Sequence, residues 1–238
     1  MFRFGVEGFD ELLGDVLSPG TLFVIAGYPG SGKTVFAVST CYANAVRGHR
    51  CAYVTFNEDR VKLYRFMKNF NMDLEKLESE GLFSFRKLPV VNDPEIVMNE
   101  LSNVMNSVKP EVLVIDSVTP LIKAMKDRLE SRAVLQNFFY ELATFSKGLV
   151  ILIVEKPLYG ELEDLGDIEF VADVIVEFTY NITAGLLSRF LKVVKARSKH
   201  LTMVELPFAI TSGKGTEMTL SPPLKAGFHC WVLSDTPP

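Results

Sequence analysis

The chain has 238 residues, 48% of them hydrophobic and 23% charged, a balance that suits one large globular domain with a buried core. A formal net charge of −4 argues against a surface that is basic all round, so nucleic-acid binding would require a local basic patch. The three cysteines, Cys41, Cys51 and Cys230, lack metal-ligand spacing, so we expect neither disulfides nor a zinc site. No apolar run approaches the roughly 18 to 20 residues that span a bilayer, so we expect no membrane insertion and a cytoplasmic protein.

The first two thirds of the chain alternate short apolar runs with segments of helical periodicity. Residues 21–26 predict a buried strand, a glycine-rich turn follows at 27–32, and residues 33–46 predict a helix. The further strands expected are 51–56, 82–85, 111–116 and 149–154, and the further helices are 60–70, 94–108 and about 131–145. This alternation predicts a parallel sheet flanked by helices.

The C-terminal third has a different pattern. Residues 173–179 and 189–195 resemble a hairpin around a turn at 181–185, and residues 203–210 and 218–220 could extend it. We therefore expect an α/β fold whose parallel core carries antiparallel strands at its C-terminal edge. Residues 1–220 are expected to form one domain, followed by an irregular tail at 221–238.

One motif carries a specific chemistry. It matches G-x-x-x-x-G-K-[ST] between a predicted strand and a predicted helix, the context that this phosphate-binding loop requires. Its residues, with the next position of the helix, are Gly27, Tyr28, Pro29, Gly30, Ser31, Gly32, Lys33, Thr34 and Val35. Backbone N–H groups and the helix N-terminus favour phosphate, and Lys33 is expected to reach its β and γ groups. The sequence predicts binding of ATP or a close relative; the alternative is a turn that only connects strand to helix.

A carboxylate ends the buried strand predicted at 111–116. Asp116 emerges at the carboxyl end of that strand, where ligands of such sheets bind. We assign Asp116 to a magnesium ion through water, together with the hydroxyl of Thr34, because this ion keeps several waters and needs few protein ligands. The alternative for Asp116 is a helix cap or a turn.

These elements together resemble a known family. The segment FGVEGFDELLG at 4–14, the phosphate loop, Asp116 and the short stretch Lys195-Ala196-Arg197-Ser198 are similar to the KaiC-like branch of the RecA-type P-loop ATPases. The resemblance covers about residues 3–220. It implies a RecA-like fold, ATP and Mg²⁺ as cofactors, and a homo-oligomer, such as a hexamer, in which a neighbouring subunit completes the site.

The resemblance also concerns the residue that activates the attacking water. The family commonly has a Glu-Glu pair in a T-F-E-E stretch, but this chain has Thr55-Phe56-Asn57-Glu58. An amide cannot accept a proton as a carboxylate does, so Glu58 remains the candidate base and Asn57 predicts slow hydrolysis or binding alone. The alternative for Glu58 and Asp59 is that they cap and charge the start of the next helix.

Lys195 and Arg197 are the candidates for the cations that complete a neighbour's site. They alternate along a predicted strand end, which would place both on one face; the alternative is a solvated basic edge. His200 either contacts nucleotide or is a surface residue. Glu155, at the end of the last parallel strand, either senses the γ-phosphate or is simply exposed.

Three functions compete at this point. The first is a slow ATPase acting as a nucleotide-dependent switch or assembly factor, and the second is an ATP-binding regulator with little hydrolysis. The third is a DNA-binding recombination protein of the RecA type. Residues 161–169 read ELEDLGDIE, whose carboxylates would repel phosphates, and the basic run Arg60, Lys62, Arg65 and Lys68 resembles a solvated helix face. The DNA function is therefore not favoured.

Overall fold

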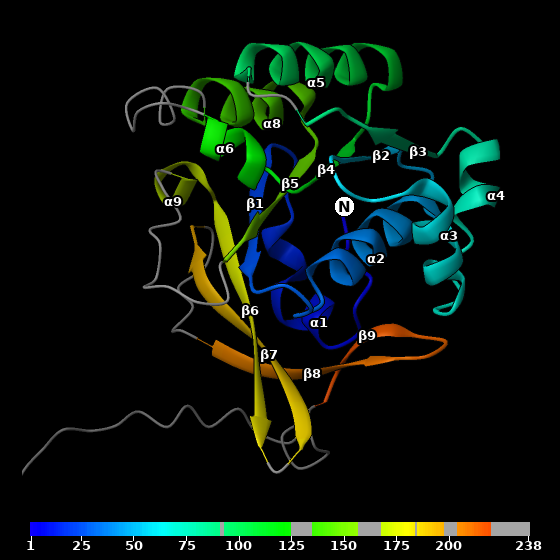
Figure 1. Cartoon of the computed structure of the whole chain (residues 1–238), viewed down its shortest axis with the longest axis vertical. Helices are drawn as coiled ribbons and strands as arrows, with labels where there is room; N and C mark the ends of the chain where they lie inside the picture. Colours follow the sequence, from blue (N-terminus) through cyan, green and yellow to red (C-terminus); the bar gives the residue numbers. More distant parts are fainter. Residues whose placement is uncertain (91–92, 125–134, 157–167, 184, 198–203, 220–238) are drawn as a thin grey trace, which may run out of the picture.

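The computed structural model describes residues 1–90, 93–124, 135–156, 168–183, 185–197 and 204–219. Within them lies a nine-stranded sheet of order β3-β2-β4-β5-β1-β6-β7-β8-β9 (Figure 1). His200, residues 161–167 of the acidic loop and the predicted tail at 221–238 lie outside the described residues. The expected architecture, a parallel core with antiparallel strands at its C-terminal edge, is confirmed.

The parallel part of the sheet consists of central strands that are buried on both faces and of one edge strand, β3, that is partly exposed. Its members are β1 (Thr21–Gly27), β2 (Cys51–Thr55), β3 (Phe83–Lys87), β4 (Val112–Asp116) and β5 (Leu149–Glu155). Every residue of β1, β2 and β4 is buried, which explains why these segments read as continuous apolar runs. Because the strands run in parallel, β1, β2, β4 and β5 all end on the side of the sheet where the phosphate loop begins.

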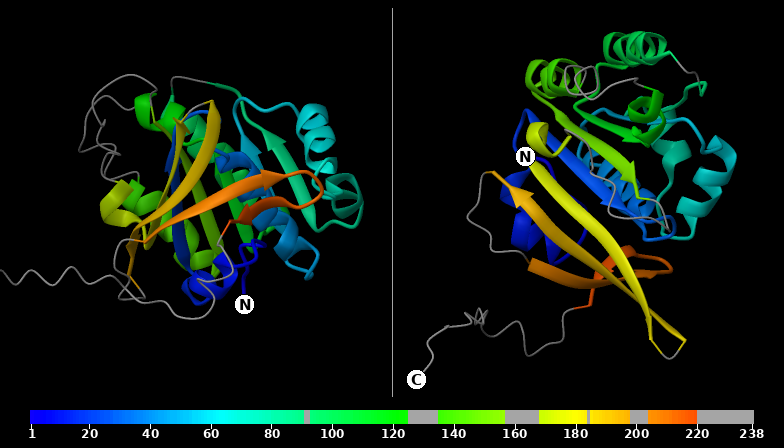
Figure 2. Two further views of the ribbon diagram at one scale, coloured as in Figure 1. Left: turned by 90° about the horizontal axis from the view of Figure 1, so that it is seen from below. Right: turned by 60° about the vertical axis from the view of Figure 1, so that its left-hand side comes forward.

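The antiparallel part begins with a long hairpin. It comprises β6 (Val174–Thr183), β7 (Leu186–Ala196), β8 (Val204–Thr211) and β9 (Gly215–Met218). β6 runs parallel to β1, and β7 then reverses direction, so the first strand of the hairpin is still a strand of the core. β6 extends into the turn predicted at 181–185, β7 begins directly after it, and the hairpin projects beyond the rest of the described part of the molecule (Figure 2).

Helices cover both faces of the sheet, and each face has its own apolar core. One core includes residues of α1 (Phe9–Leu13), α2 (Lys33–Ala45), α3 (Arg60–Lys68) and α4 (Leu74–Ser79), with the 3-10 turn Gly14–Val16. The other includes residues of α5 (Pro94–Val108), α6 (Thr119–Ala124), α8 (Tyr140–Ser146) and α9 (Ile168–Val171), with the π-helical turn Leu135–Phe139. The short helices α1, α4, α6 and α9 had no clear periodic signal in the sequence.

The N-terminal segment packs onto the helix that follows the phosphate loop. Asp10 accepts hydrogen bonds from the N–H groups of Phe4 (2.6 Å) and Gly5 (2.9 Å), and the Thr40 hydroxyl of α2 donates to the Phe4 carbonyl (3.0 Å). Gly5 has φ +73°, and a Cβ there would lie 2.5 Å from the Cβ of Ala43. The FGVEGFD sequence is thus explained physically: it forms a tight turn that fits closely against α2.

Candidate functional site

The phosphate loop lies at the carboxyl end of β1 and depends on its glycines. Gly30 and Gly32 have φ values of +76° and +107°, in the left-handed region that favours glycine. A Cβ on Gly27 would collide with the Phe178 carbonyl oxygen of β6, and one on Gly32 would lie 2.9 Å from Ile210 of β8. The antiparallel strands therefore pack directly against the loop.

Lys33 is buried at the base of this loop, with 6% of its surface exposed. Its ammonium group donates to the Tyr28 carbonyl (2.8 Å). Burial lowers the pKa of Lys33, while the negative charges of Asp116 and Glu155 act in the opposite direction. In the described part of the chain the buried Ser31 hydroxyl has no hydrogen-bond partner. The loop thus holds a cation and a buried hydroxyl without a partner, which suits an anionic ligand.

A second polar cluster lies between β2, β4 and α2. The Asp116 side chain accepts from the hydroxyl of Thr34 (2.7 Å) and from the hydroxyl of Tyr53 (2.6 Å), both at Oδ2. Burial, followed by the charge of Asp116, raises the pKa of Tyr53 well above its ordinary value. A carboxylate and a hydroxyl in contact are the hard oxygen ligands that magnesium prefers, so the residues present fit this ion. The structure brings Thr34 and Asp116 together as the sequence predicted.

Asn57 and Glu58 follow the end of β2, where the chain turns. The N–H groups of Asn57 (3.3 Å) and Glu58 (3.1 Å) both approach the hydroxyl of Thr55. Burial, followed by the negative charge of Asp116, raises the pKa of Glu58. Asn57 is exposed, and the helix cap of α3 is Asp59, whose side chain accepts from the Lys62 N–H (3.0 Å). Glu58 is therefore not the capping residue and lies within the electrostatic field of Asp116.

A pocket of about 590 Å³ opens beside the phosphate loop. Its walls combine the loop and the start of α2 with the end of α3 and with β7 and β8, and the lining residues are Gly30, Gly32, Lys33, Thr34, Val35, Phe66, Asn69, Phe70, Arg189, Ile210 and Ser212. The buried Nε of Arg189 has no hydrogen-bond partner among the described residues. Sequence reasoning missed the last six of these residues, because only the folded chain brings α3, β7 and β8 to the loop.

Hydrogen bonds join two distant segments beside the pocket. The Gly213 N–H donates to the Asn69 carbonyl (2.7 Å), and the Asn71 side chain donates to the Gly213 carbonyl (2.8 Å). The turn between β8 and β9 is thereby joined to the end of α3. A strand that the sequence indicated only as a possible extension thus forms one wall of the pocket.

Lys195 and Arg197 lie at the other end of the sheet. Lys195 pairs with Ile175, and Arg197 follows the end of β7, where its N–H donates to the Asp173 carbonyl (2.9 Å) and its guanidinium donates to the Phe170 carbonyl (2.6 Å). Asp173 is joined to Leu22, near the start of β1. The five residues from there to Gly27 span about 16 Å, so Arg197 is remote from its own phosphate loop.

The carboxyl end of β5 contributes further charges near the loop. The Glu155 side chain is exposed, and its charge offsets a part of the decrease that burial causes in the pKa of Lys33. The Lys156 N–H donates to the Gly27 carbonyl (3.0 Å), and its buried ammonium forms an ion pair with Glu177 (2.6 Å). The pair joins β5 and β6 on either side of β1. No sequence motif indicated this pair, because its partners lie 21 residues apart in the chain.

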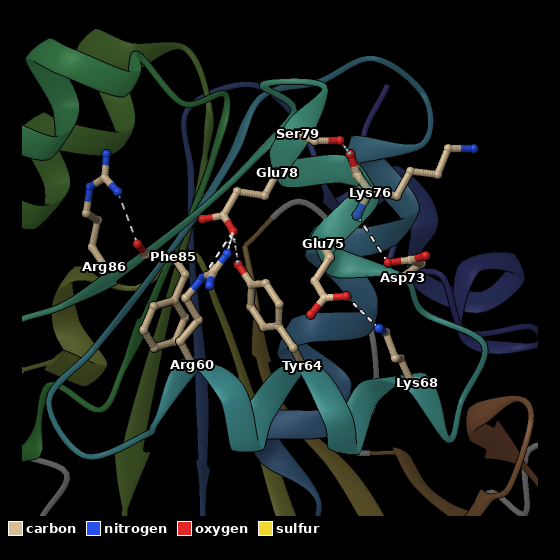
Figure 3. A network of polar contacts seen from close by, with 10 residues as sticks. All are labelled: Arg60, Tyr64, Lys68, Asp73, Glu75, Lys76, Glu78, Ser79, Phe85 and Arg86. Carbon is tan, nitrogen blue, oxygen red and sulfur yellow. Dashed lines mark hydrogen bonds and ion pairs between the residues drawn. The ribbon is translucent and has the colours of Figure 1, made fainter.

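The basic face of α3 is partly neutralised by α4. Arg60 forms an ion pair with Glu78, which also accepts from the Tyr64 hydroxyl, and Lys68 contacts Glu75 (2.5 Å) (Figure 3). Burial opposes ionisation of Glu78, but the Arg60 and Tyr64 donors prevail and lower its pKa. Two of the four cations in this run, Arg60 and Lys68, thus already have carboxylate partners, which makes the helix less suited to bind nucleic-acid phosphates.

Two comparisons with known proteins agree with the fold and with the presence of a phosphate loop. The family model described as "ATPase: KaiC" matches residues 2–221. The chain belongs to the KaiC family of ATPases. A KaiC-like protein of Pyrococcus horikoshii has a crystal structure that superimposes with a TM-score of 0.77 at 28% identity, covering 91% of this chain and 97% of that one. The family and this match identify the fold as that of a RecA-type P-loop ATPase, which implies nucleotide binding with a metal ion.

Two curated relatives differ in length. The circadian clock protein KaiC3 of Synechocystis is 28% identical over 89% of this chain, which spans only 44% of that protein. A UPF0273 protein of Methanocaldococcus jannaschii is 27% identical, with 87% of this chain and 92% of that protein covered. The chain thus spans less than half the length of KaiC3 and most of the length of the UPF0273 protein. Among its described helices, none is long and apolar enough to cross a membrane.

Proposed function

We propose that this protein binds ATP with magnesium, hydrolyses it slowly, and acts as a nucleotide-dependent switch or assembly factor. One observation carries the proposal: the buried Lys33 ammonium, the Ser31 hydroxyl and the Thr34–Asp116 pair converge on one loop at the carboxyl end of β1. Backbone N–H groups and Lys33 bind the phosphates. Thr34 and Asp116 would hold the magnesium ion, which supplies positive charge to the β and γ phosphates.

The nucleoside occupies the pocket beside the loop. A volume of about 590 Å³ lies within the range of small-molecule sites, roughly 300 to 1,000 Å³. Phe66 and Phe70 provide apolar ring surface at the wall, and Arg189, whose buried Nε has no hydrogen-bond partner among the described residues, lines the same space. Aromatic rings favour stacking with a base, and the guanidinium favours an anionic or polar group of the ligand.

The proposal of slow turnover is based on the two residues Asn57 and Glu58, which follow the end of β2. Glu58 is the general base in this proposal, because a raised pKa makes a carboxylate a better proton acceptor and because it lies near Asp116. Asn57 cannot accept a proton in the same way. Binding without hydrolysis is the second candidate function, and the observation that favours it is this asparagine.

We further propose a head-to-tail homo-oligomer, such as a hexamer, in which Arg197 and Lys195 act on a neighbour's nucleotide. The distance along β1 supports this arrangement, since Arg197 lies at the end of the sheet opposite its own phosphate loop. A head-to-tail interface joins opposite ends of two copies, and it closes into a ring or continues as a filament. Residues 1–220 form the assembling domain in this proposal, and 221–238 a separate tail.

The test measures mass and turnover in the same samples. Light scattering with and without MgATP reports assembly, and phosphate release reports hydrolysis. The proposal expects a nucleotide-dependent increase in mass and a turnover below about 1 per second. Nucleotide-dependent assembly without phosphate release would favour the binding-only function. Failure to bind ATP by calorimetry would contradict both.

A further inference from the structure

A buried tyrosine contacts the carboxylate of the magnesium site. Tyr53 of β2 is 0% exposed, and its hydroxyl donates to Oδ2 of Asp116 (2.6 Å). The Thr34 hydroxyl donates to the same oxygen (2.7 Å). β2 and β4 are neighbours in the sheet, with Tyr53 opposite Val114, so the ring reaches along the adjacent strand to its terminal carboxylate. Asp116 is therefore held from two elements, β2 and α2.

Packing alone does not explain the hydroxyl of Tyr53. The ring stacks on Phe85, with centroids 6.1 Å apart and planes inclined by 19°. A phenylalanine would provide the same ring to this core. Burial of a hydroxyl is unfavourable unless it forms a hydrogen bond, and here the bond goes to the Asp116 carboxyl oxygen. The structure thus points to a role for the hydroxyl at Asp116 itself.

We propose that Tyr53 is a positioning residue for the magnesium site: its hydroxyl fixes the rotamer of Asp116 so that the carboxylate is oriented for the ion before nucleotide arrives. This inference rests on the proposed function. With Oδ2 occupied by two donors, the carboxylate cannot rotate freely. Partners of this kind orient metal ligands, and their removal typically weakens metal binding about 10- to 100-fold.

Removal of the Tyr53 hydroxyl also has an effect on charge that would favour magnesium binding. A carboxylate that loses one donor concentrates more negative charge on its oxygens, which by itself would attract the cation more strongly. The loss of orientation is the larger effect, because the Thr34 hydroxyl still neutralises part of the charge while a single contact no longer fixes the plane of the carboxylate. The expected direction is therefore weaker magnesium binding.

The test compares Tyr53→Phe with Tyr64→Phe and the wild type. Tyr64 is a matched control: it is also a buried tyrosine packed against Phe85, but its hydroxyl donates to Glu78 (3.0 Å) at the surface of α4 (Figure 3). ATP binding is measured by calorimetry in EDTA and over a series of Mg²⁺ concentrations. Thermal unfolding without nucleotide is measured for all three proteins.

For Tyr53→Phe we expect ATP affinity in EDTA within about twofold of wild type and a Mg²⁺ requirement raised about tenfold. Tyr64→Phe should leave the Mg²⁺ requirement unchanged. An unchanged or lower Mg²⁺ requirement in Tyr53→Phe overturns the inference, as does an equal loss of affinity with and without Mg²⁺, which would indicate a general structural effect. A wild type that binds no ATP under either condition would instead contradict the proposed function.

Discussion

The parallel and antiparallel halves of the sheet differ in burial and in the part of the site that they carry. β1, β2 and β4 are buried throughout, and the groups at their carboxyl ends are Lys33, Glu58 and Asp116. β7 is mostly exposed or half-buried along its length, and it carries Arg189 and Lys195. The phosphate loop is thus built on the most deeply buried strands of the fold, whereas Arg189 of the pocket wall and the cation proposed to act on a neighbour lie on its more exposed half.

This difference suggests a division of roles within one chain. The parallel half holds the phosphate chemistry in place, since a close-packed core fixes the strand ends. The antiparallel half contributes residues to the pocket wall. It also carries Lys195, and Arg197 directly after β7, which in our proposal act on the nucleotide of a neighbouring copy. The following substitutions separate the two halves, beginning with the largest expected effect.

Arg197→Ala tests the antiparallel half. We expect phosphate release to fall at least about 100-fold, because a cation that neutralises charge on the γ-phosphate in the transition state is lost. ATP binding should stay within about twofold, because Arg197 is remote from its own loop. Arg86→Ala is the control, since Arg86 is an exposed residue of β3 whose guanidinium contacts the Phe85 carbonyl. Full activity in Arg197→Ala would contradict a site completed by a neighbour.

Mixing experiments sharpen this prediction. Arg197→Ala keeps an intact loop and Lys33→Ala keeps an intact Arg197, so a mixed assembly contains interfaces with both groups. We expect the mixture to release phosphate faster than either variant alone. If the mixture stays at the level of the separate variants, the two residues do not meet across an interface.

Lys33→Ala tests the parallel half. The loss of a buried compact cation should weaken triphosphate binding by at least about 2 kcal/mol, or roughly thirtyfold. Lys76→Ala is the matched control, because that side chain is 70% exposed on α4. Calorimetric titration with ATP measures both. Unchanged affinity in Lys33→Ala would mean that nucleotide binds elsewhere.

Asn57→Glu tests whether the asparagine after β2 limits the rate of hydrolysis. A carboxylate at this position adds a proton acceptor beside Glu58, and we expect phosphate release to accelerate at least about tenfold. Asn57→Gln has the length of glutamate without its charge and should leave the rate unchanged. Equal rates for Asn57→Glu and the wild type would remove position 57 from the catalytic assignment.

The sequence predicted most of the parallel half of the fold. Continuous apolar strands, a glycine loop of fixed spacing and a strand-terminal Asp116 are local signals, and the structure places Thr34 and Asp116 in direct contact. The long helix at 94–108 was also predicted at its observed limits, because Asp93 caps it and Pro94 starts it.

The remaining features depend on contacts between distant segments. Arg189 and Phe66 have no motif around them and become pocket residues only when β7 and α3 meet at the loop. In the sequence, Tyr53 cannot be distinguished from the other residues of a buried strand. Its hydrogen bond to Asp116 depends on the register of β2 against β4. The sequence did not predict α4, because this helix has only six residues, too few for a clear periodic pattern.

Glu58→Gln has the smallest expected effect and concerns stability. Burial and the charge of Asp116 raise the pKa of Glu58 above its ordinary value of 4.5, so the folded state binds this proton more tightly than the unfolded state. Ionisation of Glu58 therefore destabilises the fold as pH rises from 4.5 through the raised pKa, and this penalty persists at pH 7. Glutamine removes the penalty.

We expect Glu58→Gln to unfold at a higher temperature than wild type at pH 7, by no more than about 2 °C because Glu58 is only partly buried, with the difference shrinking as pH falls toward 4.5. Glu7→Gln, at an exposed position, is the control and should show no such trend. Thermal unfolding without nucleotide across this pH range measures both. A Glu58→Gln variant less stable than wild type at pH 7 would show that the carboxylate has a stabilising partner, and Glu58 would then be a poor candidate for a free general base.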